Sequence, residues 1–297
     1  RPKSSAASDV YKRQVQRDYQ KLIEESVFNI PKKTQQILFD HALKLINHID
    51  YVGAGTVEFI YDLKEKQVYF MEMNTRLQVE HPVTEMVAHV NLVQQQFEIA
   101  QGKNIAQLPV RFDGHAIEVR VNAERVEVQD NGSLNFVPEP GYVGEVHFPD
   151  ETHVRVISAV EEGSLVPPYY DSMIAQIICW GSSRKEACSR MLDYLGKVRL
   201  EGISTNLALS RMILSDAEFL KGRFDTGFLK GFLERIDFNE LKSRIEHDSG
   251  DSGKGLSQEE LLVPETNEIK VISPQMGGFY LSPSPEEDPF VREGQVC

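Results

Sequence analysis

Residues 56–82 read TVEFIYDLKEKQVYFMEMNTRLQVEHP and are the most informative part of the chain for the fold. Thr56–Tyr61 and Val68–Asn74 have the pattern of β-strands, and a short polar run connects them. The two segments therefore predict a β-hairpin. In that hairpin Glu58 lies where it could face Glu72 across the strand pair.

The second half of this stretch, EMNTRLQVE, has a polar residue at every second position: Glu72, Asn74, Arg76, Gln78 and Glu80. If the segment is extended, all five side chains lie on one face, and the following proline ends the strand. A solvated strand face held by salt bridges is the simpler alternative. The absence of lysine from the stripe and the presence of a carboxylate on the preceding strand favour a functional site.

These residue types suit the binding of a metal and an anion. The oxygens of Glu58, Glu72 and Asn74 are hard ligands, suited to Mg²⁺ held between protein and nucleotide phosphates. The planar guanidinium of Arg76 can hold a carboxylate-like anion such as bicarbonate at two points. Glu80, placed beside that anion, could act as a general base.

The rest of the chain combines helical and strand patterns and predicts an α+β fold. Apolar residues recur at helical spacing in several segments, while Gly and Pro break the region from about Gly114 to Cys179 into short strands. The predicted helices are Lys32–Ile49, Thr84–Gln101 with Thr84 as its N-cap, Arg184–Lys197 and Asn206–Leu214, and Gly114–Asn122 is a predicted strand.

Composition narrows the class of protein. The 297 residues carry a net charge of −13, which argues against nucleic acid or an anionic membrane surface as the main partner. No apolar run approaches the roughly 20 residues that span a bilayer. Cys179, Cys188 and Cys297 form no Cys-x-x-Cys pair, so a reducing compartment, the cytoplasm, is expected. Arg1–Gln14 is small, polar and basic, and is interpreted as a non-native or disordered tail.

Several motifs in order resemble one family. YVGAGTVEFIYD (51–62) and YFMEMNTRLQVEHPVTEM (69–86) resemble the ATP-grasp region of biotin carboxylase, as found in acetyl-CoA, propionyl-CoA and pyruvate carboxylases. GHAIEVRVNAE (114–124), PPYYDSMIAQIICWG (167–181) and LEGISTNLALSRMIL (200–214) resemble the C-terminal region of the same family. The resemblance covers about Val15 to Glu234.

The resemblance implies a role for each residue of the polar stripe. Glu58, Glu72 and Asn74 match the positions that hold the metal, Mg²⁺ or Mn²⁺, and the ATP phosphates. Arg76 matches the catalytic arginine, and Glu80 the base that deprotonates bicarbonate.

Residues outside and within the stripe complete the implied site. Lys21, Gln78 and the backbone of Val79 match bicarbonate contacts, together with the catalytic arginine. Arg120 matches the arginine that stabilises the biotin enolate, and Asp171 matches a residue near biotin. Tyr19 departs from the family, which usually has a histidine that contacts ATP at this position.

The tail VISPQMGGFYLSPSPEEDPFVREGQ (271–295) resembles the opening of a biotin carboxyl carrier domain, a β-rich half of a biotinyl/lipoyl-like fold, without a biotin-attachment lysine. The family's N-terminal domain, glycine-rich lid and adenine-binding segment have no counterpart before Val15. The expected organisation is a tail at 1–14, the C-terminal part of an ATP-grasp domain at 15–108, a biotin carboxylase C-terminal domain at 109–236, a linker at 237–263 and a partial carrier domain at 264–297.

The implied activity is ATP- and bicarbonate-dependent carboxylation of carrier-bound biotin through carboxyphosphate. The implied partners are a carrier domain, a carboxyltransferase subunit and further copies of the complete protein, and the family context is acyl-CoA carboxylation. We expect this chain by itself to turn over weakly or not at all. Two alternatives stay open: another ATP-grasp carbon–nitrogen ligase of the carbamoyl-phosphate or purine-pathway type, and a non-catalytic fragment that docks a carrier or subunit.

Overall fold

The structure is a computed structural model that describes residues 13–17, 20–26, 30–62, 65–105, 112–129, 133–222 and 227–249. Tyr19 and the predicted carrier segment 264–297 lie outside the described residues, as does most of the predicted tail at 1–14. Arg13 and Gln14, at the end of that predicted tail, belong to strand β1 (Arg13–Arg17). In the antiparallel pair of β1 and β2, Arg13 lies opposite Glu25 and Gln14 opposite Glu24.

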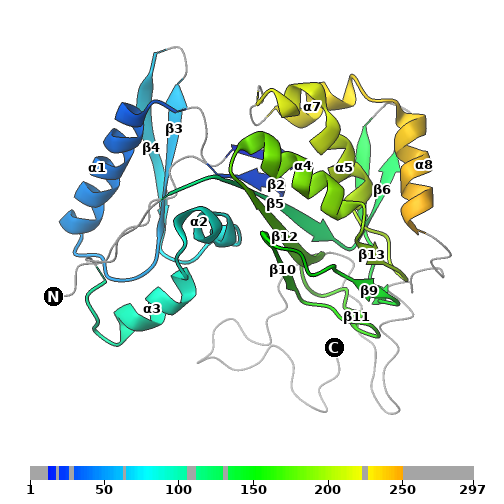
Figure 1. The fold of residues 1–297 in the computed structure, drawn as a ribbon, viewed down its shortest axis with the longest axis horizontal. Helices are drawn as coiled ribbons and strands as arrows, with labels where there is room; N and C mark the ends of the chain where they lie inside the picture. The colour runs from blue at the N-terminus through cyan, green and yellow to red at the C-terminus, as the bar shows by residue number, and fades with distance from the viewer. Residues whose placement is uncertain are drawn as a thin grey trace, which may run out of the picture. The chain divides into compact units, whose positions relative to one another are not determined.

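A five-stranded sheet forms the centre of the described part of the chain (Figure 1). Its order is β1-β2-β5-β12-β10, and all neighbouring strands run antiparallel. The strands are β1, β2 (Gln20–Glu25), β5 (His115–Asn122), β12 (Met173–Gly181) and β10 (Val154–Ser158). β5 lies between β2 and β12, so both of its edges are paired.

The two faces of this sheet pack against different helices. Helix α4 (Arg184–Leu195) covers the face on which Ile117 and Val119 belong to the main hydrophobic core. Helix α2 (His81–Ala88) packs on the opposite face, against Ala116. Because side chains alternate along a strand, the even-numbered polar residues of β5 point toward the side of α2.

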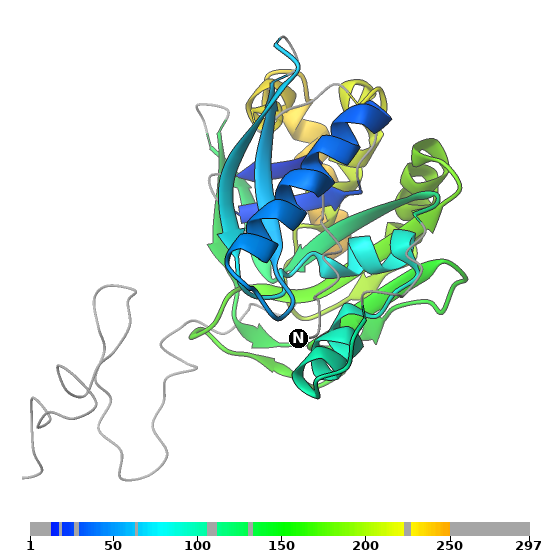
Figure 2. The same cartoon turned by 90° about the vertical axis from the view of Figure 1, so that its left-hand side faces the viewer.

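The predicted hairpin is confirmed as β3 (Thr56–Asp62) and β4 (Gln67–Asn74). Its register places Glu58 opposite Glu72, as expected from the sequence. Helix α1 (Lys32–His48) lies beside the hairpin in Figures 1 and 2. The helix buries residues spaced four apart, which form one face: Thr34, Leu38, Ala42 and Ile46.

The polar stripe is not one strand face. β4 ends at Asn74, residues 75–80 form a bend and then a turn, and α2 begins at His81. Pro82 lies in the first turn of α2, where a proline fits because the missing N–H has no partner in the helix. The prediction that Pro82 ends a strand was therefore wrong: it begins a helix.

The predicted helix Thr84–Gln101 is two helices. α2 ends at Ala88 because His89 has a left-handed backbone with φ of 52°. Helix α3 (Leu92–Ala100) begins after Asn91, whose side chain accepts a hydrogen bond from the N–H of Gln94 at 2.7 Å. Thr84 is buried inside α2 and is not an N-cap.

Helix α8 (Phe238–Ser249) lies within the segment 237–263 that was predicted to be a linker. Leu241 is fully buried, and Ile245, one helical turn later, packs against the same core. This apolar pair makes 238–249 part of the folded unit despite its polar composition. Residues 250–263 of the predicted linker lie outside the described residues.

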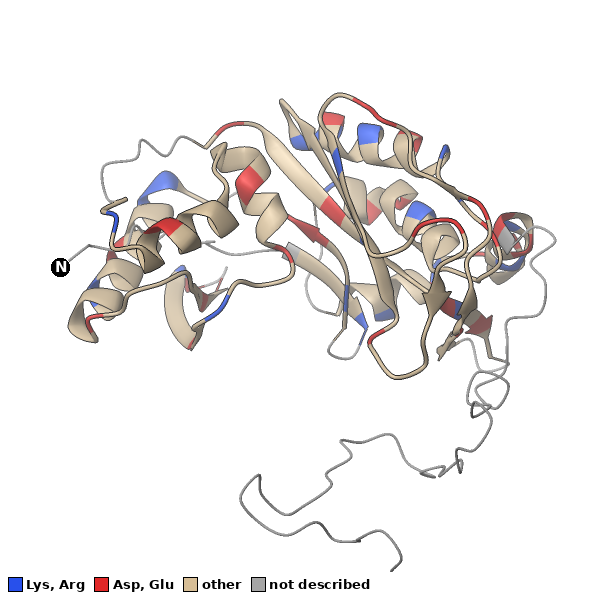
Figure 3. Ribbon diagram, turned by 90° about the horizontal axis from the view of Figure 1, so that it is seen from below, with Lys and Arg blue, Asp and Glu red and all other residues tan. Residues whose placement is uncertain are grey.

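Short helices and strands complete the described part of the chain. No helix among the described residues is long and apolar enough to cross a bilayer. In the view of Figure 3, its basic and acidic residues are interspersed. The predicted strand at 114–122 and helices at 184–197 and 206–214 are confirmed within two residues. The remaining elements are β6 (Glu124–Val128), β7 (Leu134–Pro138), β8 (Gly141–Tyr142), β9 (Val146–His147), β11 (Leu165–Val166), β13 (Arg199–Leu200), α5 (Leu207–Ser215), α6 (Ala217–Leu220) and α7 (Phe228–Leu233).

Candidate functional site

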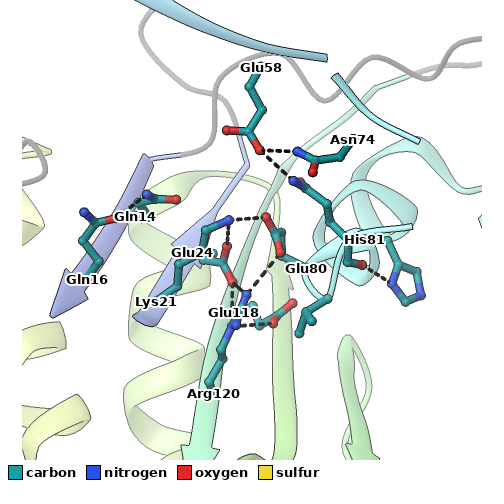
Figure 4. A network of polar contacts seen from close by, with 12 residues as sticks. Gln14, Gln16, Lys21, Glu24, Glu58, Asn74, Glu80, His81, Glu118 and Arg120 are labelled. Carbon is teal, nitrogen blue, oxygen red and sulfur yellow. Dashed lines mark hydrogen bonds and ion pairs between the residues drawn. The ribbon is translucent and has the colours of Figure 1, made fainter. Parts of the chain in front are cut away.

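Four charged side chains form a closed ring where β2, β5 and the start of α2 meet (Figure 4). Lys21 lies 3.2 Å from Glu24 and contacts Glu80 through a hydrogen bond. Arg120 donates to Glu24 at 2.8 and 2.9 Å and to Glu80 at 3.1 Å. Cations and anions therefore alternate around the ring, and we call Lys21, Glu24, Glu80 and Arg120 the charge ring.

The backbone around Glu80 fixes its place in the charge ring. Glu80 is the residue before α2, and its carbonyl accepts from the N–H of Val83 at 3.2 Å. The carbonyl of the preceding Val79 accepts from the side chain of Gln176 on β12 at 2.8 Å. The turn is thus tied to the sheet on one side and to the helix on the other, which directs the Glu80 carboxylate toward β2 and β5.

Burial makes the charges of this ring interdependent. The Glu24 and Glu80 side chains are 0% and 3% exposed, whereas Lys21 is 22% exposed. Burial lowers the pKa of Lys21, but Glu24 and Glu80 raise it by a larger amount in sum, so the net pKa of Lys21 is raised. Arg120 shows the same balance, so both cations stay charged.

Glu118 adds a third carboxyl group next to the charge ring. It lies directly opposite Glu24 in the β2–β5 register, and it accepts a hydrogen bond from the Gln176 amide at 2.8 Å. The Nε of Arg120 is 3.9 Å away. Burial first, and then repulsion from Glu24, raise the pKa of Glu118 to about 8.

A second polar group lies at the end of the hairpin. The Asn74 side-chain amide donates to Glu58 and to Glu72, at 3.1 Å in each case. Gln78 donates to the same oxygen of Glu58 at 2.7 Å. Two carboxylates and two amides are therefore brought together, as the stripe predicted, although Gln78 reaches Glu58 from a turn and not from the strand.

The oxygens of this group are suited to a divalent cation, although the donors are few. Within the described ranges, no cluster of three or more His, Cys, Asp or Glu side chains could hold a metal ion. Glu58, Glu72 and the side-chain oxygen of Asn74 are hard donors, and two carboxylates that share an amide are consistent with Mg²⁺ completed by phosphate oxygens or water.

Two predicted residues stay apart from both groups. The exposed Arg76 donates to the carbonyl of Leu77 at 3.2 Å and forms no ion pair with any residue that the structure describes. The exposed Asp171 accepts from the N–H of Met173 at 2.9 Å. The structure therefore places Arg76 at the surface near the turn and does not bring Asp171 into contact with Arg120.

Three residues of the site were missed from the sequence: Glu24, Glu118 and Gln176. Glu118 and Arg120 interrupt the apolar strand HAIEVRVN at alternate positions, so they share a face of β5. That pattern could have identified Glu118. No local pattern indicates Glu24 or Gln176, because each meets the site only through strand pairing.

Two protein families match the chain in sequence. The family described as "Biotin carboxylase C-terminal domain" matches residues 118–231. The family described as "Carbamoyl-phosphate synthase L chain, ATP binding domain" matches residues 11–108. Both polar groups fall within these matches.

Relatives and solved structures agree with the family matches. The chain is 44% identical over 221 residues to Biotin carboxylase 1 of Bacillus subtilis. The matched region covers 73% of this chain and 48% of that protein. It resembles the biotin carboxylase domain of a thermophilic 2-oxoglutarate carboxylase bound to bicarbonate, with a TM-score of 0.69, 36% identity, and coverage of 75% of this chain and 50% of that one.

A biotin carboxylase–β-γ-ATP complex from Campylobacter jejuni is similar with a TM-score of 0.68 and 36% identity, covering 73% of this chain and 48% of that one. The chain spans about half the length of the curated relatives that it matches.

Proposed function

Because the chain is homologous to biotin carboxylases over about half of their length, we propose that it supplies the bicarbonate- and metal-binding part of an ATP-dependent biotin carboxylation site. The observation that supports this most directly is the convergence of Lys21 and Arg120 on the buried carboxylate of Glu80. Two cations favour the ionised form of this carboxylate, which is the form that a general base beside a bound anion must have.

Bicarbonate would bind at the turn between β4 and α2. Arg76 is exposed and forms no ion pair with a described residue, so its guanidinium is accessible to an anion. Lys21 contacts Glu80, and Gln78 and Val79 directly precede Glu80 in the chain. Lys21, Gln78 and the backbone N–H of Val79 would complete the site. Glu80 would then remove the bicarbonate proton as the γ-phosphate is transferred to give carboxyphosphate.

Glu58, Glu72 and Asn74 would hold Mg²⁺ or Mn²⁺ against the nucleotide phosphates. The cation would neutralise negative charge on the transferring phosphoryl group. The chain's own contribution is to keep two carboxylates and an amide together at the end of the hairpin, where the side chain of Gln78 links them to the bicarbonate turn.

Carboxyphosphate would break down to CO₂ and phosphate, and the phosphate would take the proton from the ureido nitrogen of biotin, which then attacks CO₂. Arg120 would stabilise the negative oxygen that biotin carries in this step. Its guanidinium is held by Glu24 and Glu80, and the Arg120 side chain is 16% exposed, so it is oriented yet partly accessible. Asp171 would lie near biotin on the loop before β12. The hydroxyl of Ser172, its neighbour, lies 3.2 Å from the Asn122 amide on β5 and thereby ties this loop to the sheet.

A biotin carboxyl carrier domain would present biotin, and a carboxyltransferase subunit would use the carboxylated product. The resemblance of 264–297 to a carrier domain, an acyl-CoA as the final acceptor, homo-oligomers and a cytoplasmic location remain predictions. The ATP-binding match is shared with carbamoyl-phosphate synthase, but the match at 118–231 to the biotin carboxylase C-terminal domain favours biotin as the acceptor.

The test is to co-express the chain with the first half of Biotin carboxylase 1 of Bacillus subtilis and to purify the complex. We expect ATP cleavage that requires both bicarbonate and free biotin. A folded complex whose ATP cleavage is unaffected by biotin but rises with ammonia or another amine would support the carbon–nitrogen ligase alternative. A folded complex that cleaves no ATP under any condition would support the docking alternative.

A further inference from the structure

An ionised Glu118 would add a negative charge that no cation of the charge ring balances. The charge ring contains the carboxylates of Glu24 and Glu80 and the cations Lys21 and Arg120, so its formal charges cancel. Glu118 would add one further negative charge, and its side chain is 0% exposed. An uncompensated buried charge is costly, and a carboxyl group in such a place takes up a proton.

The neighbours of Glu118 on every packed element are consistent with a neutral carboxyl group. On β2 it faces Glu24, a like charge, and on β12 its hydrogen-bond donor is the neutral amide of Gln176. On β5 itself, Arg120 is 3.9 Å away and is already engaged by Glu24 and Glu80. Its other oxygen is buried and accepts no hydrogen bond among the described residues.

The acidic residue of helix α2, Glu85, interacts with groups other than Glu118. Helix α2 packs on this face of the sheet and carries Glu85, which pairs with Arg155. Glu85 also accepts a hydrogen bond from the N–H of Leu92 at 2.6 Å. Among the described residues, Arg120 is the cation within ion-pair distance of Glu118.

We propose that Glu118 is a positioning residue that remains protonated, so that Glu24 stays a carboxylate and holds Lys21 and Arg120 against Glu80. If Glu118 ionised, its charge would compete with Glu24 for Arg120 and would oppose the negative charge on Glu24. The protonation state is a property of this cluster alone. Its importance for Arg120 in catalysis rests on the proposed function.

The protonation can be measured by infrared spectroscopy on the 297-residue chain. A protonated carboxylic acid has a C=O stretch that is distinct from the bands of a carboxylate. We expect this band in the wild type at pH 6, its loss with a midpoint near pH 8, and its absence from Glu118→Gln from pH 6 upward, where ordinary carboxyl groups are ionised. The matched control is Glu127→Gln on β6, because hydrogen bonds from Arg125 and Asn135 lower the pKa of Glu127.

Only one spectroscopic result supports the proposal. A carboxylic acid band that disappears in Glu118→Gln but persists in Glu127→Gln assigns the proton to Glu118. The same carboxylic acid signal in wild type and Glu118→Gln, or no such signal at pH 6, overturns the proposal. If Glu118→Gln does not fold, Glu118→Asp retains the acid and should shift the band, and an unshifted band again overturns the assignment.

The positioning role is tested separately in the co-expressed complex. We expect biotin-dependent ATP cleavage by the wild type to fall above about pH 8, and this fall to be absent from Glu118→Gln. An identical alkaline limb in both proteins would overturn the positioning role. A complex that lacks biotin-dependent cleavage at every pH would instead contradict the proposed function, while the infrared result would still decide the protonation state.

Discussion

Glu24 and Glu118 lie directly opposite each other on antiparallel strands β2 and β5, and neither residue is exposed to solvent. Like charges in this cross-strand position repel each other, and burial strengthens the repulsion. Lys21 and Arg120 hold Glu24 as a carboxylate, so the repulsion mainly raises the pKa of Glu118. This pair links the stability of the sheet to the protonation of the site.

The first prediction concerns the pH dependence of stability. The pKa of Glu118 is about 8 in the folded chain and about 4.5 in the unfolded chain, so between these values the folded state binds more protons. The contribution of Glu118 to the free energy of unfolding is complete below pH 4.5 and is lost as the pH rises to 8. The loss should be at most on the order of a few kcal/mol.

Urea denaturation at several pH values measures this effect. Glu118→Gln should flatten the decline between pH 5 and pH 8, because the amide does not titrate. A variant whose stability declines as steeply as that of the wild type would show that another group is responsible.

The second prediction concerns the charge ring. Arg120→Ala leaves Glu24 and Glu80 buried with one cation instead of two, and should lower the free energy of unfolding by about 3–5 kcal/mol. Arg125→Ala is the matched control, because Arg125 pairs with Glu127 at the surface and should contribute at most about 1 kcal/mol. Equal effects of the two substitutions in urea denaturation would contradict the structural role of the ring.

The third prediction concerns Arg76. Because its side chain is exposed and, among described residues, hydrogen-bonds only to the carbonyl of Leu77, Arg76→Ala should change stability by no more than about 0.5 kcal/mol. In the co-expressed complex the same substitution should lower biotin-dependent ATP cleavage by at least about a hundredfold, as expected for a lost charge-stabilising donor. Cleavage at the wild-type rate would exclude Arg76 from catalysis.

The fourth prediction concerns the metal. Glu72→Gln replaces an exposed carboxylate and should leave the fold intact. It should weaken the binding of Mn²⁺ to the ATP-loaded complex by at least about tenfold. Electron paramagnetic resonance measures how much Mn²⁺ is bound to the protein. Glu65→Gln, at the opposite end of the hairpin, is the control and should not alter binding. Unchanged affinity in Glu72→Gln would remove this residue from the proposed metal site.

The fifth prediction concerns helix α8. Leu241→Ala should lower the free energy of unfolding by about 2–5 kcal/mol, because Leu241 is fully buried in the main core. Leu220→Ala removes the same atoms from a side chain that is 49% exposed and should have a smaller effect. Similar small losses in both variants, measured by urea denaturation, would indicate that 238–249 behaves as the linker predicted from composition.

Local sequence patterns predicted the local parts of the structure. The hairpin, the pairing of Glu58 with Glu72 and helix α1 follow from the alternation or helical spacing of neighbouring residues. The same reasoning failed at residues 75–80, since an alternating pattern does not distinguish a strand from a turn that leads into a helix. It failed again at α8, where the polar composition predicted a linker. Composition averages over the segment and does not show that Leu241 is fully buried in the core.

The sequence by itself determined that the chain resembles biotin carboxylase, and it selected the polar stripe, Lys21 and Arg120 as candidates. Only the tertiary structure decided which of these meet. Lys21 and Glu80 are 59 residues apart, and Arg120 and Glu24 are 96 residues apart. Their contacts exist because β2 pairs with β5 and α2 packs on the same face of the sheet. Burial of apolar side chains that are distant in sequence stabilises that arrangement. The same packing encloses Glu118 and favours its protonated form, which no local sequence pattern indicates.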